Sequence, residues 1–297
     1  MSNSRLPAFT REKIARLAED ALRRSQTVGV FPTPIIAVQQ TIGIRDRISM
    51  RDLPKAIEAR KPPIWSRILG AYWHDERVVF IDQEQPEHRQ FWTDAHEATH
   101  AMCGWHAPIL RLDNEDTLFK DLHAGVEAEA NFGAGYLIFQ GGRFHREALK
   151  DQISMRTPLA LSAQYGASRH ATLHYYVEHH PYAVALLIAG RYPYSDGSIP
   201  IWNSIESADF ERRFGRLQGH LPGGKLRTLD SSSAVFADIL QASHTSTDPP
   251  SKIVGLRDTD GTSRPFVAEA FFNQWTHFVL VAERQATRLG RRVRLAS

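Results

Sequence analysis

The sequence lacks the features that mark membrane, secreted and disulfide-stabilised proteins. Its 297 residues include a single cysteine, Cys103, so no disulfide can form within the chain. The longest apolar run, residues 182–190, is far shorter than the roughly 20 residues that cross a bilayer. The first residues carry charges with no apolar segment behind them, which argues against a secretory signal. We therefore expect a cytoplasmic protein.

The composition is that of an ordinary folded protein. Hydrophobic residues make up 42% of the chain and charged residues 23%, which excludes disordered and collagen-like classes. The formal net charge is only +3. Arginines gather near the end of the chain, at 284–294, where they could contact nucleic acid, but a solvated helix face or tail is the simpler interpretation.

The hydrophobic pattern predicts an α+β fold. A helix is expected over residues 10–26 with Thr10 as its cap, followed by two short strands at 68–73 and 77–81. A second helix begins near Pro86 and ends at Gly104, because proline suits a first turn and glycine a helix end. Residues 118–142 predict a third helix closed by two glycines.

We expect three regions along the chain. Residues 1–150 form a compact α+β unit. Residues 151–194 place Gly166 between two helical runs, which is the spacing of a helix-turn-helix. Residues 195–297 form a small C-terminal α+β domain of unknown role, with three strands separated by turns at Asp260-Gly261 and near Asn273.

The residues with the most specific chemistry are His96, Glu97 and His100, in the phrase HEATH. Side chains four apart stack on one face of a helix, so both histidine rings can point at one metal ion. Glu97 is rotated by about 100° from His96 and is better placed to deprotonate a metal-bound water than to bind the metal. The alternative is an ordinary pair of histidines that face solvent or are satisfied in the core.

A catalytic zinc ion usually has three protein ligands, so a third ligand is needed. Glu127 shares a helical face with Asn131 and with small or apolar residues, and a buried carboxylate requires a partner such as a metal. Glu129 lies about 200° further round the same helix, so we expect it to face solvent.

His106 is the other candidate for the third ligand. It completes the spacing H-E-x-x-H-x-x-C-x-x-H, which is that of metzincin peptidases except that Cys103 stands where glycine turns the chain. Gly104 follows one position late, and Met155 could supply a Met-turn. From the residues alone, Glu127 and His106 both remain open.

Two phrases of the chain resemble the ImmA/IrrE metallopeptidase family. HRQFWTDAHEATHAM is similar to the family phrase R-x-F-x-x-A-H-E-x-x-H-A, and EAEANFGAGYLIF is similar to E-x-x-A-N-x-F-A-A-x-L-L some 30 residues later. With the preceding helix and strands and the helix-turn-helix pattern, the resemblance covers roughly residues 10–180. The chain departs from the family where Thr99 replaces glycine, Gly133 replaces alanine, and YLIFQGG replaces an ending that closes with proline.

The resemblance implies a zincin-like core that binds zinc, or manganese, through His96, His100 and Glu127. It also implies that Glu97 is the general base, and Asn131 could orient Glu127 from outside the ligand set. A downstream histidine or tyrosine could stabilise the oxyanion, and the candidates are His174, Tyr175 and Tyr176.

The function implied by the resemblance is cleavage of a helix-turn-helix transcriptional repressor, which releases silenced genes. One rival is a DNA-binding regulator that reads its site with the helix carrying Arg169 and His170. That helix has no run of lysine or arginine for phosphate contacts. Another rival is a pseudo-peptidase that binds metal only for structure, against which the presence of Glu97 argues.

Overall fold

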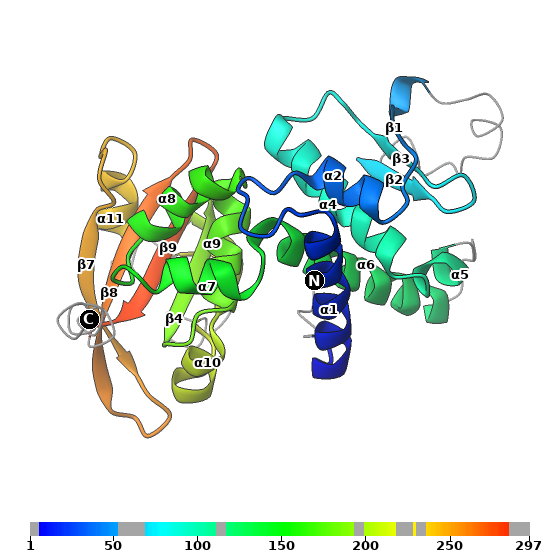
Figure 1. Cartoon of the computed structure of the whole chain (residues 1–297). Helices are drawn as coiled ribbons and strands as arrows, with labels where there is room; N and C mark the ends of the chain where they lie inside the picture. Colours follow the sequence, from blue (N-terminus) through cyan, green and yellow to red (C-terminus); the bar gives the residue numbers. More distant parts are fainter. Residues whose placement is uncertain are drawn as a thin grey trace. The chain divides into compact units, whose positions relative to one another are not determined.

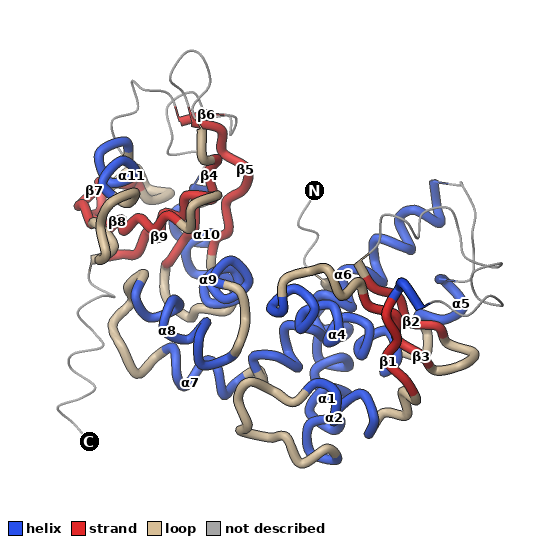
Figure 2. Tube along the Cα trace, turned by 90° about the horizontal axis from the view of Figure 1, so that it is seen from above, coloured by secondary structure: helices blue, strands red, loops and turns tan. Residues whose placement is uncertain are grey.

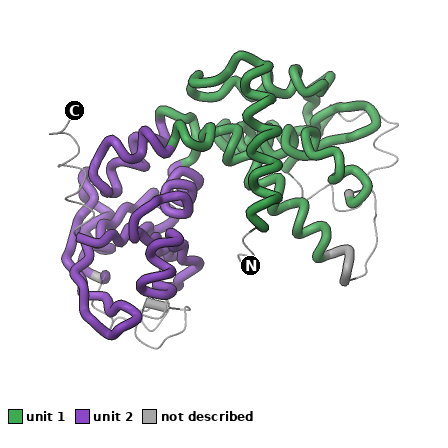
Figure 3. Tube along the Cα trace, turned by 60° about the horizontal axis from the view of Figure 1, so that its bottom comes forward, with its two compact units in different colours: residues 1–144, 164–168 green, residues 145–163, 169–297 purple. Residues whose placement is uncertain are grey.

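The computed structural model describes residues 6–52, 69–110, 117–192, 199–217, 228–229 and 236–284. Most of the arginine-rich end of the chain lies outside these ranges. The chain divides into two compact units (Figure 3), which we call unit 1, residues 1–144 and 164–168, and unit 2, residues 145–163 and 169–297. Both units mix helices and strands, which confirms the α+β class.

Unit 1 contains helices and a small three-stranded sheet (Figure 1). Its elements are α1 (Ala8–Arg24), α2 (Ile35–Thr41), β1 (Asp46–Ser49), η1 (Met50–Asp52), β2 (Gly70–Trp73), β3 (Val78–Ile81), α4 (Glu87–Met102), α5 (His106–Leu110), α6 (Thr117–Phe139) and the start of α7 (Gly142–Ala148).

The small sheet has one strand more than the sequence pattern predicts. Its order is β1-β3-β2, in which β1 pairs parallel to β3 and β2 antiparallel to it. The β2 and β3 strands match the expectation, whereas β1 went unrecognised because a short parallel strand needs a distant partner. Helix α1 begins at Ala8, directly after Pro7. Thr10 therefore lies inside the helix, and the expectation that it caps the helix is wrong.

Helix α4 lies between the sheet and the other helices of unit 1, with contacts to β2 and β3 and to α1, α2 and α6. A charged pair ties it to β1, since Arg47 Nε donates to Asp94 Oδ1 at 2.8 Å. Gln39 of α2 donates to the main-chain oxygen of Asp94 at 3.0 Å. These bonds to a buried aspartate fix the rotation of α4 relative to the strands.

A glycine lets β2 approach α4 closely. A Cβ on Gly70 would overlap Cγ2 of Thr93 and would lie 3.2 Å from Cδ1 of Ile81. Thr93 is one helical turn before Glu97, and Tyr72 is two residues beyond Gly70. The contact therefore brings the backbone of β2 alongside the segment of α4 that carries the histidines.

Thr99 of α4 and Gly133 of α6 meet in space. Thr99 of α4 is fully buried, and a Cβ on Gly133 of α6 would lie 2.6 Å from its Oγ1 and closer still to its Cγ2. The side chain of Thr99 thus fills the space that Gly133 leaves, which keeps α4 and α6 at close range.

The departure at the end of α6 also has a structural role. Gln140, which is fully buried and has a φ of 51°, follows the last residue of the helix. Its side chain accepts a hydrogen bond from Gly29 N at 2.8 Å and donates to Thr27 O at 3.1 Å and to Thr33 Oγ1 at 3.0 Å. One amide therefore holds the segment that links α1 to α2.

Unit 2 is built on a six-stranded sheet with strand order β6-β5-β4-β9-β8-β7 (Figure 2). Neighbouring strands pair antiparallel. Its elements are α8 (Arg156–Tyr165), α9 (Arg169–Glu178), β4 (Val184–Gly190), β5 (Ile199–Glu206), α10 (Ala208–Phe214), β6 (Thr228–Leu229), α11 (Ala237–Ala242), β7 (Ser251–Arg257), β8 (Ser263–Phe272) and β9 (Thr276–Glu283), of which α8 ends in unit 1.

The two faces of this sheet are covered by different helices. Alternate residues of β4, β8 and β9 form one buried cluster with Phe210 and Phe214 of α10 and with Ile239 and Leu240 of α11. Helix α9 packs on β4 and β5, and the ring of His170 contacts that of Phe278 of β9. Because β4 is buried along its whole length, its apolar run 184–190 is a central strand.

The segment expected to be a separate helix-turn-helix region contributes to unit 2. Gly166 does separate two helices, with a φ of 64°. Half of the ten residues of α9 are buried, however, and β4 supplies a central strand of the sheet. The compact units therefore divide near residue 145 instead of at residues 150 and 194. In the described part of the chain, no helix is long and apolar enough to cross a membrane.

The packing of Thr99 on Gly133 gives a testable expectation. Gly133→Ala gains about 1 kcal/mol of helix propensity, but overpacking against Thr99 typically costs about 1–3 kcal/mol. We expect a net loss in the free energy of unfolding, measured by urea denaturation. The double variant Thr99→Ala/Gly133→Ala should recover it.

Gly125→Ala is the matched control, because this glycine lies on the same helix and a Cβ there would meet nothing within 4 Å. It should be neutral or stabilising by up to about 1 kcal/mol. A Gly133→Ala protein at least as stable as Gly125→Ala would show that the two helices are not in tight contact at Thr99.

Candidate metal centre

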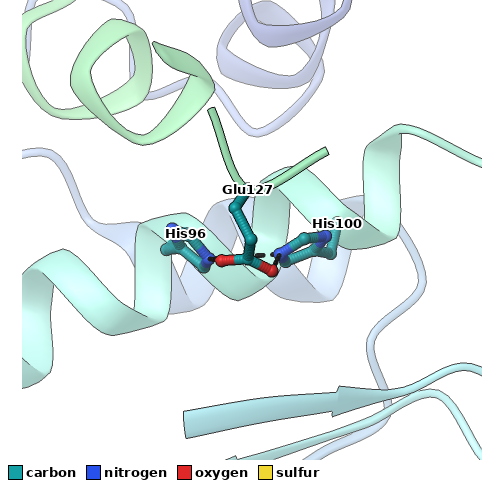
Figure 4. A group of neighbouring side chains, drawn as sticks. All are labelled: His96, His100 and Glu127. Carbon is teal, nitrogen blue, oxygen red and sulfur yellow. Dashed lines mark hydrogen bonds and ion pairs between the residues drawn. The ribbon is translucent and has the colours of Figure 1, made fainter. Parts of the chain in front are cut away.

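Helices α4 and α6 bring together two imidazoles and a carboxylate. His96 and His100 come from successive turns of α4, and Glu127 of α6 points between their rings (Figure 4). One ligand atom from each of the three lies within 4.8 Å of the others. His96 keeps 14% of its side chain exposed and Glu127 keeps 37%, so the centre is accessible from solvent.

The spacing of these atoms fits a small divalent ion. The two Nε2 atoms are 3.1 Å apart, and Glu127 oxygens lie 3.2 Å from His96 Nε2 and 3.5 Å from His100 Nε2. Tetrahedral zinc with bonds of about 2.0–2.1 Å separates its ligand atoms by about 3.3 Å. Two nitrogens and one oxygen are a donor set of catalytic zinc sites, and they leave a coordination position for water.

The second ring nitrogen of His96, Nδ1, has a hydrogen-bond partner on α6. His96 Nδ1 lies 3.2 Å from Asn131 Oδ1, which can accept its proton. Asn131 therefore supports His96, and not Glu127 as we had expected from their spacing on one helix. The side chains of Glu127 and Asn131 lie one turn apart on α6, so both reach α4 while neither needs to contact the other.

Glu97 is buried beside the centre, with 5% of its surface exposed. Burial raises the pKa of Glu97 to about 7; the nearby His96 and the backbone of Tyr72, which hydrogen-bonds it, act in the opposite direction. A carboxyl group with a pKa near neutrality can both take up and release a proton at physiological pH. Tyr72 belongs to β2, which Gly70 allows to approach α4.

The surroundings favour the metal-binding protonation state of His100 and Glu127, but not that of His96. Burial lowers the pKa of His100 to about 4, so its ring is neutral at pH 7. Burial also acts to lower the pKa of His96, but the hydrogen bond to Glu127 and the charges of Glu97 and Glu127 outweigh it, and the net shift is upward. Burial opposes ionisation of Glu127, yet hydrogen bonds from His100 and His96 hold its pKa well below the usual range.

The structure places His106 outside the group of candidate ligands. Its Nδ1 lies 2.9 Å from Nδ1 of His100, on the side of that ring away from Glu127, and its Nε2 lies 2.9 Å from Glu129 Oε2. The metzincin-like interpretation is thus not supported, because both ring nitrogens of His106 already have partners. Met155, offered as a Met-turn, belongs to unit 2.

The expectation that Glu129 faces solvent is wrong. Its side chain is only 18% exposed and accepts hydrogen bonds from Trp105 Nε1 at 2.7 Å and from His106 Nε2. The segment after α4 turns at Cys103 and packs α5 along a second side of α6. A face of α6 opposite the ligand face is therefore covered. The sequence signal that could have revealed this is Trp105-His106, two ring N–H groups in need of an acceptor.

The downstream residues considered for oxyanion stabilisation belong to unit 2. His174 pairs with Glu178 at 3.3 Å, and the ring of Tyr175 stacks on that of His179 at 4.1 Å. Tyr176 is 1% exposed. These contacts give each of the three side chains a place in the packing of α9.

Comparison with known proteins finds a family match over part of the chain and a similar fold. Residues 64–175 match the family model of the IrrE N-terminal-like domain, a family of M78 peptidases. A solved structure of a Mycobacterium tuberculosis transcriptional regulator is similar in fold, with a TM-score of 0.50 and 12% identity over 93% of this chain and 77% of that one. Among curated proteins, no sequence matches.

The family match runs through β2, β3 and α4 to α8 and into α9, and it includes α4 and α6, the two helices that carry His96, His100 and Glu127. Because the family model covers this whole arrangement, residues 64–175 belong to the IrrE N-terminal-like family of ImmA/IrrE metallopeptidases.

Proposed function

We propose that this chain is a metal-dependent endopeptidase of the ImmA/IrrE type, with His96, His100 and Glu127 as metal ligands and Glu97 as the general base. The convergence of the three ligand atoms within 4.8 Å of one another, next to the buried Glu97, carries the proposal. Membership of a peptidase family supports the same reaction class.

Zinc is the simplest choice of ion, and manganese is also compatible with nitrogen and oxygen ligands. When bound, the ion would acidify a water molecule and polarise the carbonyl of a peptide bond. Glu97 takes the proton of that water and returns it to the leaving amine nitrogen. In the metal-free site burial raises the pKa of Glu97 to about 7, and a bound cation would shift it downward, toward the ionised form that accepts a proton.

We further propose that the substrate is a helix-turn-helix transcriptional repressor, whose cleavage releases silenced genes. The membership of residues 64–175 in the IrrE N-terminal-like family and the fold shared with a transcriptional regulator support a role in gene control. Such control takes place in the cytoplasm, where we propose that the protein acts.

Direct DNA binding is a weaker second candidate. Arg169 and His170 are exposed at the start of α9. The face of α9 that is buried in unit 2 cannot enter a groove of DNA, and it consists of Thr172, Leu173, Tyr175, Tyr176 and Val177. The guanidinium of Arg169 already lies over the ring of Phe271. A gel-shift series at increasing salt would support DNA binding only if affinity fell steeply, as phosphate contacts require.

Metal content tests the ligand set. Purified wild-type protein should bind about one equivalent of zinc, and Glu127→Ala should lose most of it, because three-ligand sites are greatly weakened when one ligand is removed. His123→Ala is the matched control, since His123 lies one turn before Glu127 on α6 and is exposed. Equal zinc in Glu127→Ala and wild type, measured by mass spectrometry, would contradict the assignment.

Activity tests the general base. With a candidate helix-turn-helix repressor as substrate, Glu97→Gln should reduce kcat by about 10²–10⁴-fold while zinc content is unchanged. Glu76→Gln, which changes an exposed glutamate in the β2–β3 turn, should retain full activity. Undiminished cleavage by Glu97→Gln would remove this residue from the reaction, and a zinc-loaded wild type that cleaves nothing would favour a pseudo-peptidase.

A further inference from the structure

The two histidines of the candidate metal centre are supported in different ways. Both direct Nε2 toward Glu127, and both direct Nδ1 away from it. His96 meets the amide oxygen of Asn131, which can only accept a proton. His100 instead meets a ring nitrogen of His106, which accepts or donates according to its tautomer. The tautomer of His106 therefore determines whether the Nε2 atom of His100 has a free lone pair.

Glu129 fixes that tautomer. An ionised carboxylate has no proton to donate, so the 2.9 Å contact with His106 Nε2 requires the proton on the histidine. A neutral imidazole with a proton on Nε2 has a bare Nδ1, which then accepts from Nδ1–H of His100 at 2.9 Å. Because a neutral His100 ring carries its single N–H proton on Nδ1, its Nε2 has a free lone pair that can bind a cation.

The surroundings hold this chain of hydrogen bonds in place. Trp105 Nε1 donates to the same Glu129 oxygen at 2.7 Å, which sets the orientation of the carboxylate. The Lys13 ammonium lies 3.6 Å from the centre of the Trp105 ring and adds a positive charge nearby. His106 itself is fully buried, so water cannot compete for either of its nitrogens.

We propose that His106 and Glu129 are positioning residues that lock His100 in the tautomer whose Nε2 lone pair faces the metal position. This inference rests on the proposed metal-dependent function and extends it to two residues that touch neither metal nor substrate. Outer partners of this kind typically change metal affinity by about 10–100-fold when removed. The relay reaches from α4 through α5 to α6 and ends on a carboxylate two residues from Glu127.

Two nearly isosteric variants separate positioning from packing. His106→Asn keeps an oxygen close to the place of Nδ1, so it can still accept from His100, whereas His106→Leu has a similar volume and no acceptor. We expect His106→Leu to weaken zinc binding by about 10–100-fold and His106→Asn to recover most of that loss. Competition with a chromophoric chelator measures the affinity, and thermal unfolding of the metal-free proteins shows whether the two variants are equally folded.

The proton positions can be read directly in the wild type, which needs no variant to fold. Two-bond ¹H–¹⁵N spectra of the zinc-loaded protein should show His106 protonated at Nε2 and bare at Nδ1. Glu129→Gln should weaken this preference, since an amide can donate as well as accept. A proton on Nδ1 of His106 would overturn the proposal, because His100 would then have no acceptor.

The failure of this inference can be told from a failure of the proposed function. If wild type binds no zinc, the proposed metal centre is wrong and the relay falls with it. If wild type binds zinc, Glu127→Ala does not, and His106→Leu binds as tightly as wild type, only the relay is overturned. Weaker binding by His106→Leu that His106→Asn does not restore would assign His106 to packing alone.

Discussion

The close approach of α4 and α6 is the constraint on which the candidate site depends. A glutamate side chain is short, so Glu127 lies between His96 and His100 only if its helix is nearly in contact with theirs. The pair Thr99 and Gly133 sets this distance, because threonine fills the space that a glycine leaves. On the other side, Gly70 lets β2 approach the same helix and brings the backbone of Tyr72 to Glu97. Gly133 thus allows Glu127 to approach α4 from α6, and Gly70 allows the backbone of Tyr72 to approach it from β2.

The electrostatics of the centre follow from this packing. Two carboxylates near each other in a partly dry site cannot both be fully ionised without a compensating charge. In the metal-free site the two carboxyl groups ionise to different extents. Glu127 has two imidazole partners and a lowered pKa, whereas burial raises the pKa of Glu97 to about 7. A bound divalent cation would favour the ionised form of both groups. Within the proposed mechanism, Glu97 is therefore the carboxylate that accepts the proton, and Glu127 remains a ligand.

Features encoded by local spacing could be predicted from the sequence. The i, i+4 histidines, the ends of α4 and the hairpin strands β7 to β9 follow from periodicity and turn residues. Glu127 required the family phrase as well, since periodicity alone left His106 open. The parallel strand β1 and the burial of Glu129 could not be predicted, because each depends on a partner far along the chain. The contribution of β4 to a second unit was hidden for the same reason, as a run of seven apolar residues does not identify its neighbours.

Helix α6 shows how a helix can serve a site from two sides. Glu127 and Glu129 point about 200° apart around the axis of α6. One neighbouring element could therefore supply hydrogen-bond donors to only one of the two carboxylates. Here α4 covers the first and the segment from Cys103 through α5 covers the second, and His106 joins the two layers by contacting both His100 and Glu129. In the relay that we propose, Glu129 acts on His100 through the ring of His106, without direct contact with Glu127. A change at Glu129 should therefore alter the tautomer of His100 while leaving the position of Glu127 unchanged.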